Sequence, residues 1–433
     1  MQLPSRIPSP QLKLPFKLSR RSSEHLVGLD IQPGFVAAVQ ARVNGSIAAE
    51  RAAALALPAD CVRDGEVLDE STLSEVLREL FAASGLPKRV RVGVANQRTV
   101  LRTLELPPVT DEKELAAAVN FQAQDQVPMP LNNAVMDFHP IGIVDTPAGP
   151  RQRVVLVAAQ RDMIERLLTA VRGAGLSAEG IDLAAFALIR ALHRAAPASS
   201  PEGEVEQGGR VLYLNIDGLT NLAIAEGSVC RFTRVVGSGL EGMASELAER
   251  RSIALMDARA LLAAVDLTAP APAGGDLTGA QGTNESFVEG DADAEESATP
   301  EGEPLSPEEA EERESAMSYE ELTALESAPA GPHADQPDTE LLNVLENGIR
   351  DISGEVRNSL DFHRSQEGGG EVSHVVMSGA AQDIPGFAAA LQGALGVEVR
   401  CQEVGVLDRA LADSVSLHRL AVATGLATAE APQ

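Results

Sequence analysis

Two segments far apart in the sequence share one pattern, an apolar run that ends in a polar side chain and a turn. The first run spans residues 26–34 and reaches Asp30, and the second spans 211–221 and reaches Asn215 and Asp217. Apolar runs of this length, bounded by small or turn-forming residues, are typical of buried strands. The pair favours a fold in which each of two halves contributes one strand-then-acid turn.

The order of the predicted elements also indicates two similar halves. A chain of 433 residues exceeds the roughly 250–300 residues at which single cores stop growing. Residues 24–106 predict strand, strand, helix, strand and strand, and a strand-strand-strand-helix order starts again at Arg210. We therefore assign 24–106, completed by 404–427, to a first half, and 210–267 with 338–403 to a second half.

The helix of the first half has clear sequence signals. Its apolar residues follow the spacing of a single helix face: Leu73, Val76, Leu77, Leu80 and Phe81. Thr72 and Glu75 have the spacing of a capping box, and Gly85 is placed like a C-cap glycine.

Residues 107–183 predict a small inserted α/β subdomain. A helix from Asp111 to Gln126 stops at Pro128 and Pro130, because proline lacks the N–H that would continue it. Two strands and a second helix follow. Residues 184–209 predict a helix and a linker rich in Pro, Ser, Glu and Gly.

The charge is concentrated in one segment. The net charge is −28, and residues 271–330 alone contain 17 Asp and Glu with a single Arg, Arg313. Residues 268–337 hold few large apolar side chains, so we predict a long disordered acidic loop there. No cluster of Lys, Arg and aromatic residues is present in the sequence, which argues against binding to nucleic acid.

The N-terminus is basic but does not look like a signal peptide. Arg6, Lys13, Lys17, Arg20 and Arg21 precede the first acid, Glu24, and prolines interrupt the apolar positions. We interpret residues 1–23 as a disordered leader. The alternative is a peripheral contact with anionic lipid, worth about 1 kcal/mol per basic residue at the surface.

A series of short motifs carries a resemblance to a known family. The motifs are Val27-Gly28-Leu29-Asp30-Ile31, Leu104-Glu105-Leu106-Pro107, Phe121-Gln122-Ala123, Val127-Pro128-Met129-Pro130, Met136-Asp137-Phe138, Phe232-Thr233-Arg234, Gly237-Ser238-Gly239, Ser378-Gly379-Ala380, Pro385-Gly386-Phe387 and Ala421–Ala427. In this order and spacing the chain resembles the PilM family of type IV pilus assembly proteins, relatives of actin and of the cell-division protein FtsA.

The resemblance implies a fold, a place and a partner. The fold is actin/hexokinase-like, with two lobes, the inserted subdomain and ATP with Mg²⁺ in the cleft. The protein is then a cytoplasmic adaptor at the inner face of the cell membrane, in the type IV pilus or the related type II secretion platform. It binds the cytosolic tail of a PilN-like membrane protein near the motor ATPase. Residues within 107–183 would border the groove that takes up this peptide.

The resemblance also implies a nucleotide site, which this sequence matches only in part. Its candidate residues are Asp30, Gln32, Gly34, Asn215, Asp217, Gly218, Ser378 and Gly379, with Asp30 and Asp217 as candidates to hold Mg²⁺ through water. Relatives carry Gly at the position of Gln32, Lys at that of Ala37 and Asp at that of Asn215. Two registers stay open for Asp217: it replaces that acid in a turn shorter by one residue, or its carboxylate faces the phosphates and repels them. We expect hydrolysis to be weak or absent.

Two other functions are possible on the same fold. One is an active ATPase or small-molecule kinase, which needs an intact second phosphate turn. The other is an FtsA-like membrane-associated filament protein. Such proteins end in an amphipathic helix, whereas residues 427–433 have no apolar face.

Overall fold

The computed structural model describes residues 26–43, 47–147, 149–193, 209–268, 338–366, 368–408, 410–411 and 415–428. The leader predicted at 1–23 and, apart from Thr268, the acidic loop predicted at 268–337 lie outside these residues. Within the described ranges, no helix has both the length and the apolar character that a membrane crossing requires.

The first sheet has the strand order β10-β6-β1-β2-β3-β16. Its strands are β1 (Val27–Gln32), β2 (Phe35–Val43), β3 (Ile47–Ala56), β6 (Arg89–Val94), β10 (Ser177–Leu183) and β16 (Gly405–Val406). The strands β1, β2 and β3 are antiparallel neighbours, and β6 and β10 continue from β1 in parallel.

The second sheet repeats this arrangement. Its order is β13-β12-β11-β14-β15, formed by β11 (Arg210–Ile216), β12 (Thr220–Glu226), β13 (Val229–Val236), β14 (Val372–Ser378) and β15 (Val399–Cys401). Again three antiparallel strands are followed by two parallel ones. The predicted two similar halves are therefore confirmed, since β11 occupies the place in its sheet that β1 occupies in the first.

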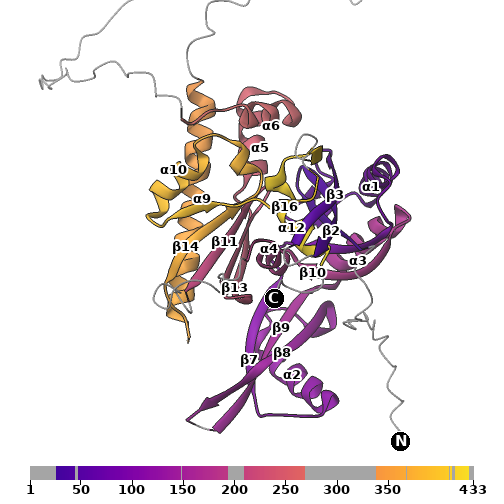
Figure 1. Cartoon of the computed structure of the whole chain (residues 1–433), viewed down its shortest axis with the longest axis vertical. Helices are drawn as coiled ribbons and strands as arrows, with labels where there is room; N and C mark the ends of the chain where they lie inside the picture. Colours follow the sequence, from indigo (N-terminus) through magenta and orange to yellow (C-terminus); the bar gives the residue numbers. More distant parts are fainter. Residues whose placement is uncertain are drawn as a thin grey trace, which may run out of the picture. The chain divides into compact units, whose positions relative to one another are not determined.

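Helices lie on both faces of each sheet, and one pair of them is shared (Figure 1). The outer face of the first sheet packs on α1 (Glu70–Ser84) and α3 (Arg161–Gly173). A common core between the sheets contains α4 (Ala184–Leu192) and α12 (Ala421–Leu426). The outer face of the second sheet packs on α5 (Leu240–Arg251), α6 (Leu255–Ala263), α9 (Thr339–Ser365) and α10 (Phe387–Leu395).

The helix α12 fits closely because glycines face it and lie within it. A Cβ atom on Gly28 of β1 would lie 1.8 Å from the carbonyl oxygen of Ala423. A Cβ atom on Gly425 would lie 1.9 Å from the carbonyl oxygen of Ala187 in α4. Every residue of α12 is buried, so this short helix joins the first sheet to α4.

A separate core forms from most of the predicted insertion and from the strand that precedes it. The strands β7 (Val100–Leu106), β9 (Gly149–Gln160) and β8 (Ala134–Thr146) form a three-stranded sheet in that order, and α2 (Glu112–Gln126) packs on it (Figure 1). A short 3-10 helix, η1 (Leu131–Asn133), leads into β8. The helix α3 and strand β10 belong instead to the first sheet and its core. The separate core thus extends from Val100 to Gln160, whereas the predicted insertion covers 107–183.

Two local features of the first half differ from the prediction. A third long strand, β3, and a small hairpin of β4 (Val62–Arg63) and β5 (Glu66–Val67) precede α1. The helix α1 is capped by Asp69, whose side chain accepts hydrogen bonds from the N–H groups of Ser71 and Thr72, so the predicted capping box of Thr72 and Glu75 is wrong. The C-cap at Gly85 is confirmed, with a φ of 60°.

The Asp69 cap gives a first testable prediction. Asp69→Ala leaves two backbone N–H groups of the first turn without their acceptor, and we expect the melting temperature to fall by about 2 °C. Asp69→Asn keeps an oxygen acceptor and serves as the matched control, with a smaller change. Thermal unfolding followed by circular dichroism measures both, and equal melting temperatures for the natural protein and the alanine variant would contradict the prediction.

Candidate functional site

Strand alternation directs the predicted site residues toward one another. Successive side chains of a strand point to opposite faces. In β1, Leu29 and Ile31 enter the outer core of the first sheet, so Asp30 and Gln32 face the second sheet. In β11, Leu214 and Ile216 enter the outer core of the second sheet, so Asn215 faces the first.

Asp30 is buried with only half of its carboxylate satisfied. It is 1% exposed, Oδ1 accepts a hydrogen bond of 3.0 Å from Nε2 of Gln32, and Oδ2 has no partner. Burial and, to a smaller extent, the charge of Asp217 raise the pKa of Asp30, and the Gln32 amide lowers it; the net result is a pKa of about 7. Ala37 lies directly opposite Asp30 in the β1–β2 ladder, so this position supplies no cation to the carboxylate.

Asp217 is also buried, but both of its oxygens are used. Oδ2 accepts a hydrogen bond of 2.8 Å from Nδ2 of Asn215, and Oδ1 accepts one of 2.8 Å from the backbone N–H of Ala380. Burial raises the pKa of Asp217, and the positive charge of Arg419 opposes this shift. The carboxylate therefore turns back onto its own half of the protein.

The two strand-then-acid turns are in direct contact. A Cβ atom on Gly218 would lie 2.2 Å from the carbonyl oxygen of Pro33, so no side chain fits between the turns. Gly34, with a φ of 89°, adopts the left-handed backbone that glycine favours. The two halves therefore meet through backbone at the point where the turns face each other.

Beside this contact, a cation of the second half donates a hydrogen bond to the first half. Arg259 of α6 forms an ion pair with Glu241 of α5, and its Nη1 donates a hydrogen bond of 3.1 Å to the carbonyl oxygen of Leu57 in the first half. The N–H of Leu57 donates in turn to the carbonyl oxygen of Gly34. Arg259 and Glu241 thus lie against the tip of the first turn.

The turn at Ser378 and Gly379 is bonded to the segment that leads into α12. The Ser378 hydroxyl and the Gly379 N–H both donate to the carbonyl oxygen of His418, at 2.9 and 3.0 Å. This turn connects β14 to the 3-10 helix η2 (Ala380–Asp383), and His418 belongs to the 3-10 helix η3 (Leu417–Leu420). The side chain of Arg419 in η3 lies over the ring of Phe35, 5.1 Å from its centre.

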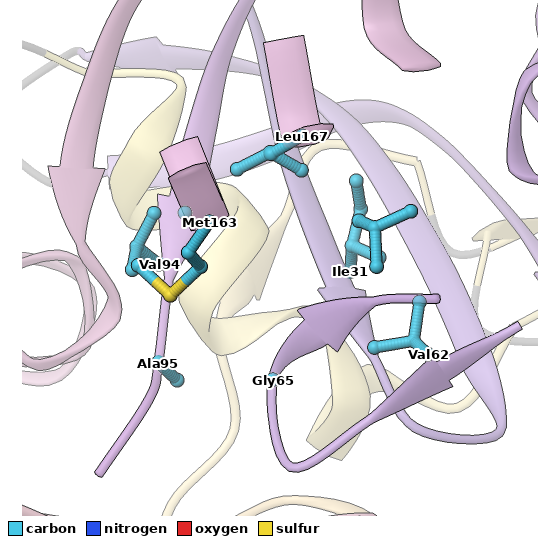
Figure 2. A pocket seen from close by; sticks show the side chains of 9 residues that line it. Ile31, Val62, Gly65, Val94, Ala95, Met163 and Leu167 are labelled. Carbon is cyan, nitrogen blue, oxygen red and sulfur yellow. The ribbon is translucent and has the colours of Figure 1, made fainter. Parts of the chain in front are cut away.

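A small pocket lies on the other side of β1. Figure 2 shows Ile31, Val62, Met163 and Leu167 pointing into it, with Gly65 of the β4–β5 hairpin at its edge. Its volume is about 10 Å³, close to the space that one water molecule needs. Ligand pockets commonly measure roughly 300–1,000 Å³, so this pocket is part of the apolar core.

The contacts around the turns decide how well the site fits Mg-ATP. Oδ2 of Asp30, buried and unpartnered, would suit a water bound to Mg²⁺. The other groups do not fit: Asp217 accepts from the N–H of Ala380, the carbonyl of His418 accepts from the Ser378 hydroxyl and the Gly379 N–H, and Pro33 and Gly218 touch. In this arrangement the residues do not form a Mg-ATP site.

All eight predicted site residues nevertheless lie around this one junction, and their role in nucleotide binding stays a prediction. The sequence analysis missed Arg259, Glu241, His418 and Arg419, which close the junction from α5, α6 and η3. Only one signal was available for them: charged side chains in otherwise apolar segments close to the predicted turns or to the C-terminal motif.

Comparisons with known proteins agree on the fold. The profile of the family described as type IV pilus assembly protein PilM matches residues 28–260. A solved PilM–PilN type IV pilus biogenesis complex contains a chain with 19% identity and a TM-score of 0.64, and the alignment covers 93% of this chain and 97% of that one. This likeness confirms the predicted two-lobe α/β fold.

Two further structures show a weaker likeness. The ethanolamine utilization protein EutJ from Carboxydothermus hydrogenoformans has 14% identity and a TM-score of 0.44, with 93% of this chain and 88% of that chain covered. The MreB5 protein of Spiroplasma citri, bound to ADP, has 12% identity and a TM-score of 0.41, with 93% and 95% covered.

Proposed function

Because this chain belongs to the PilM family of type IV pilus assembly proteins, we propose that it is a scaffold of the pilus inner-membrane platform that binds the cytosolic tail of a PilN-like membrane protein. The observation that carries the proposal is the family match, supported by the likeness to a chain of a PilM–PilN complex. The same proposal places it in the cytoplasm beside the membrane, near the motor ATPase.

We propose that the tail binds at the β8–β10 face, defined here by the outer edges of β8 and β10. Each strand is at the end of its sheet, with one neighbour among the described strands. Exposed edges take up extended peptides through backbone hydrogen bonds. On β8, the bulge at Gly142 and the proline at 140 disturb the far end of the strand, which leaves the residues before Pro140 as the regular edge.

One acidic side chain on this face has no cation paired with it among the described residues. Asp137 lies on β8, whereas the nearby Asp182 of β10 forms an ion pair with Arg190. Partial desolvation raises the pKa of Asp137. The hydrogen bond from the N–H of Phe138 and the charge of His139 lower it, and the charge of Asp182 raises it slightly. Asp137 is nonetheless exposed, so its carboxylate is free to attract a basic residue of an incoming peptide.

The test is a single charge reversal. Asp137→Arg is expected to weaken binding of a synthetic PilN-like N-terminal peptide by about tenfold or more, because it replaces attraction by repulsion and a bulky side chain. Fluorescence anisotropy with the labelled peptide and the full chain measures the affinity. Deletion of 107–183 is unsuitable, because it removes α3 and β10 from the first sheet.

The matched control lies on the same strand. Asp145→Arg makes the same change at an exposed residue beyond the bulge, and the peptide should bind it as it binds the natural protein. Equal affinity of the Asp137 variant and the natural protein, or an equal loss in both variants, would place the peptide elsewhere.

The scaffold proposal needs no turnover of ATP. The second turn carries Asn215 where hydrolysis would call for an acid, and an amide cannot take up a proton as a base. An active ATPase or kinase is therefore disfavoured. An FtsA-like filament protein is a different proposal, and sedimentation with and without nucleotide distinguishes it from a scaffold.

A further inference from the structure

The junction of the two halves is filled by groups of the chain itself. Asp217 places one oxygen 2.8 Å from the N–H of Ala380 and the other 2.8 Å from the amide nitrogen of Asn215. These are the bonds that an oxygen of a bound anion would make. The carboxylate is 1% exposed, so an outside anion could take these donors only by displacing it.

The charge of Arg419, which packs against the first half, acts on the Asp217 carboxylate. Arg419 lies over the ring of Phe35 in β2, and its charge acts on Asp217. The backbone carbonyl of Asp217 accepts a hydrogen bond of 2.8 Å from the N–H of Leu240, which fixes the turn to the start of α5. Asp217 is thus tied to β11, to η2 and to α5, and it attracts a residue that packs on the first sheet.

The closing contacts depend on the position of this turn. Gly218 follows Asp217 directly and rests on the carbonyl oxygen of Pro33. Nearby, Arg259 reaches the carbonyl oxygen of Leu57, and the Gly379 N–H reaches that of His418. Phosphate groups placed between the turns would have to separate Gly218 from Pro33 and take the N–H of Ala380 from Asp217.

We propose that the Asp217 carboxylate is a built-in anion of the cleft, which replaces a bound phosphate and keeps the two halves closed without nucleotide. The inference goes beyond scaffold function, because it concerns how the closed arrangement is maintained. We expect Mg-ATP to compete poorly for the N–H of Ala380, because the Asp217 carboxylate is part of the same chain and therefore acts at a high effective concentration.

Hydrogen exchange measured by mass spectrometry on the full chain tests the proposal. Without nucleotide, segments 30–35 and 378–383 should be protected in the natural protein, and about 1 mM Mg-ATP should leave their exchange unchanged. In Asp217→Ala, both segments should exchange roughly tenfold faster. Added Mg-ATP should then slow them, because its phosphates can reach the vacated donor.

Two controls keep the outcomes distinct. Asp351→Asn alters an exposed carboxylate on α9 of the second half, which makes none of the contacts described above, and its exchange in 30–35 should match the natural protein. Asp217→Asn retains an acceptor oxygen and should fall between the natural protein and the alanine variant.

Either of two results would overturn the proposal: protection of the natural protein by Mg-ATP, or unchanged exchange in Asp217→Ala. The first needs no variant, so the proposal stays testable even if the alanine variant does not fold. No peptide is present in these measurements, so a failed peptide test for the scaffold function would leave their outcome unaffected.

Discussion

Gly28→Ala is expected to lower the free energy of unfolding by about 3 kcal/mol, at the upper end of the cost of overpacking a core. The added Cβ would lie 1.8 Å from the carbonyl oxygen of Ala423 and 2.6 Å from the backbone nitrogen of Ala427. Both neighbours are backbone atoms, so no side-chain rotation relieves the clash. Either α12 moves away from β1 or the sheet bends.

Gly180→Ala is the matched control for this prediction. Gly180 is also a strand residue of the first sheet, but the nearest atom to an added Cβ there is Nε of Arg91, at 3.8 Å. Its stability should stay within about 0.5 kcal/mol of the natural protein. Urea unfolding followed by circular dichroism compares the three proteins, and a Gly28 variant as stable as the Gly180 variant would contradict the described packing of α12.

Asp30→Asn is expected to stabilise the protein at pH 8, by about 2 kcal/mol. The carboxyl of Asp30 has a pKa of about 7 in the folded protein, whereas its ordinary value is 3.8. The folded state therefore holds a proton that the unfolded state has released, and stability falls as the pH rises from 3.8 to 7. Above this window the folded protein carries the full cost of a buried charge beside Asp217.

The size of this effect is set by two opposing contributions. The difference between a pKa of 3.8 and one of about 7 corresponds to roughly 4 kcal/mol by linkage. The asparagine amide needs a partner of its own at the position of Oδ2, which has none, and this reduces the gain. Gln32 can still donate to the remaining oxygen, so the local bond is kept.

The measurement compares two pH values. Asp30→Asn should be more stable than the natural protein at pH 8 and less stable near about pH 4, at the lower end of the window, where the natural protein no longer carries the buried charge and the variant keeps the cost of its unpartnered amide. Urea unfolding at both pH values measures this reversal. Asp351→Asn changes an exposed carboxylate on α9 and should show the same difference from the natural protein at both pH values. A variant that is less stable than the natural protein at pH 8 would mean that the Asp30 charge is favourable in the folded state.

Periodic segments were predictable from the sequence, and Ala-rich ones were not. The helix over Leu73–Phe81 and the strand-strand-strand-helix order from Arg210 were predicted, and the structure has α1, β11, β12, β13 and α5 there. The strand β3 was missed because its sequence, IAAERAAALA, lacks alternation and favours helix by propensity. Its ladder with β2 overrides that preference. Similarly, α3 and β10 read as part of the insertion, because only pairing with β6 shows that they complete the first sheet.

The site shows a comparable division. The resemblance supplied the residues that lie on the two turns, and alternation along β1 and β11 explains why they face one another. The contacts that fill the junction could not be predicted, because they join residues distant in sequence, such as Arg259 with Leu57 and Gly379 with His418. Nor does the sequence reveal which way the Asp217 carboxylate points, since either register of the turn suits an apolar strand ending in an acid.

The position of α12 also affects how the protein is made. The inner face of β1 is covered only when residues 421–426 have been synthesised, almost 400 residues after β1 itself. Translation adds roughly 5–20 residues per second, so the nascent first sheet waits on the order of tens of seconds for its missing layer. We expect it to stay partly unfolded or chaperone-bound during that time, which makes the completion of the first sheet a late step in the synthesis of these residues.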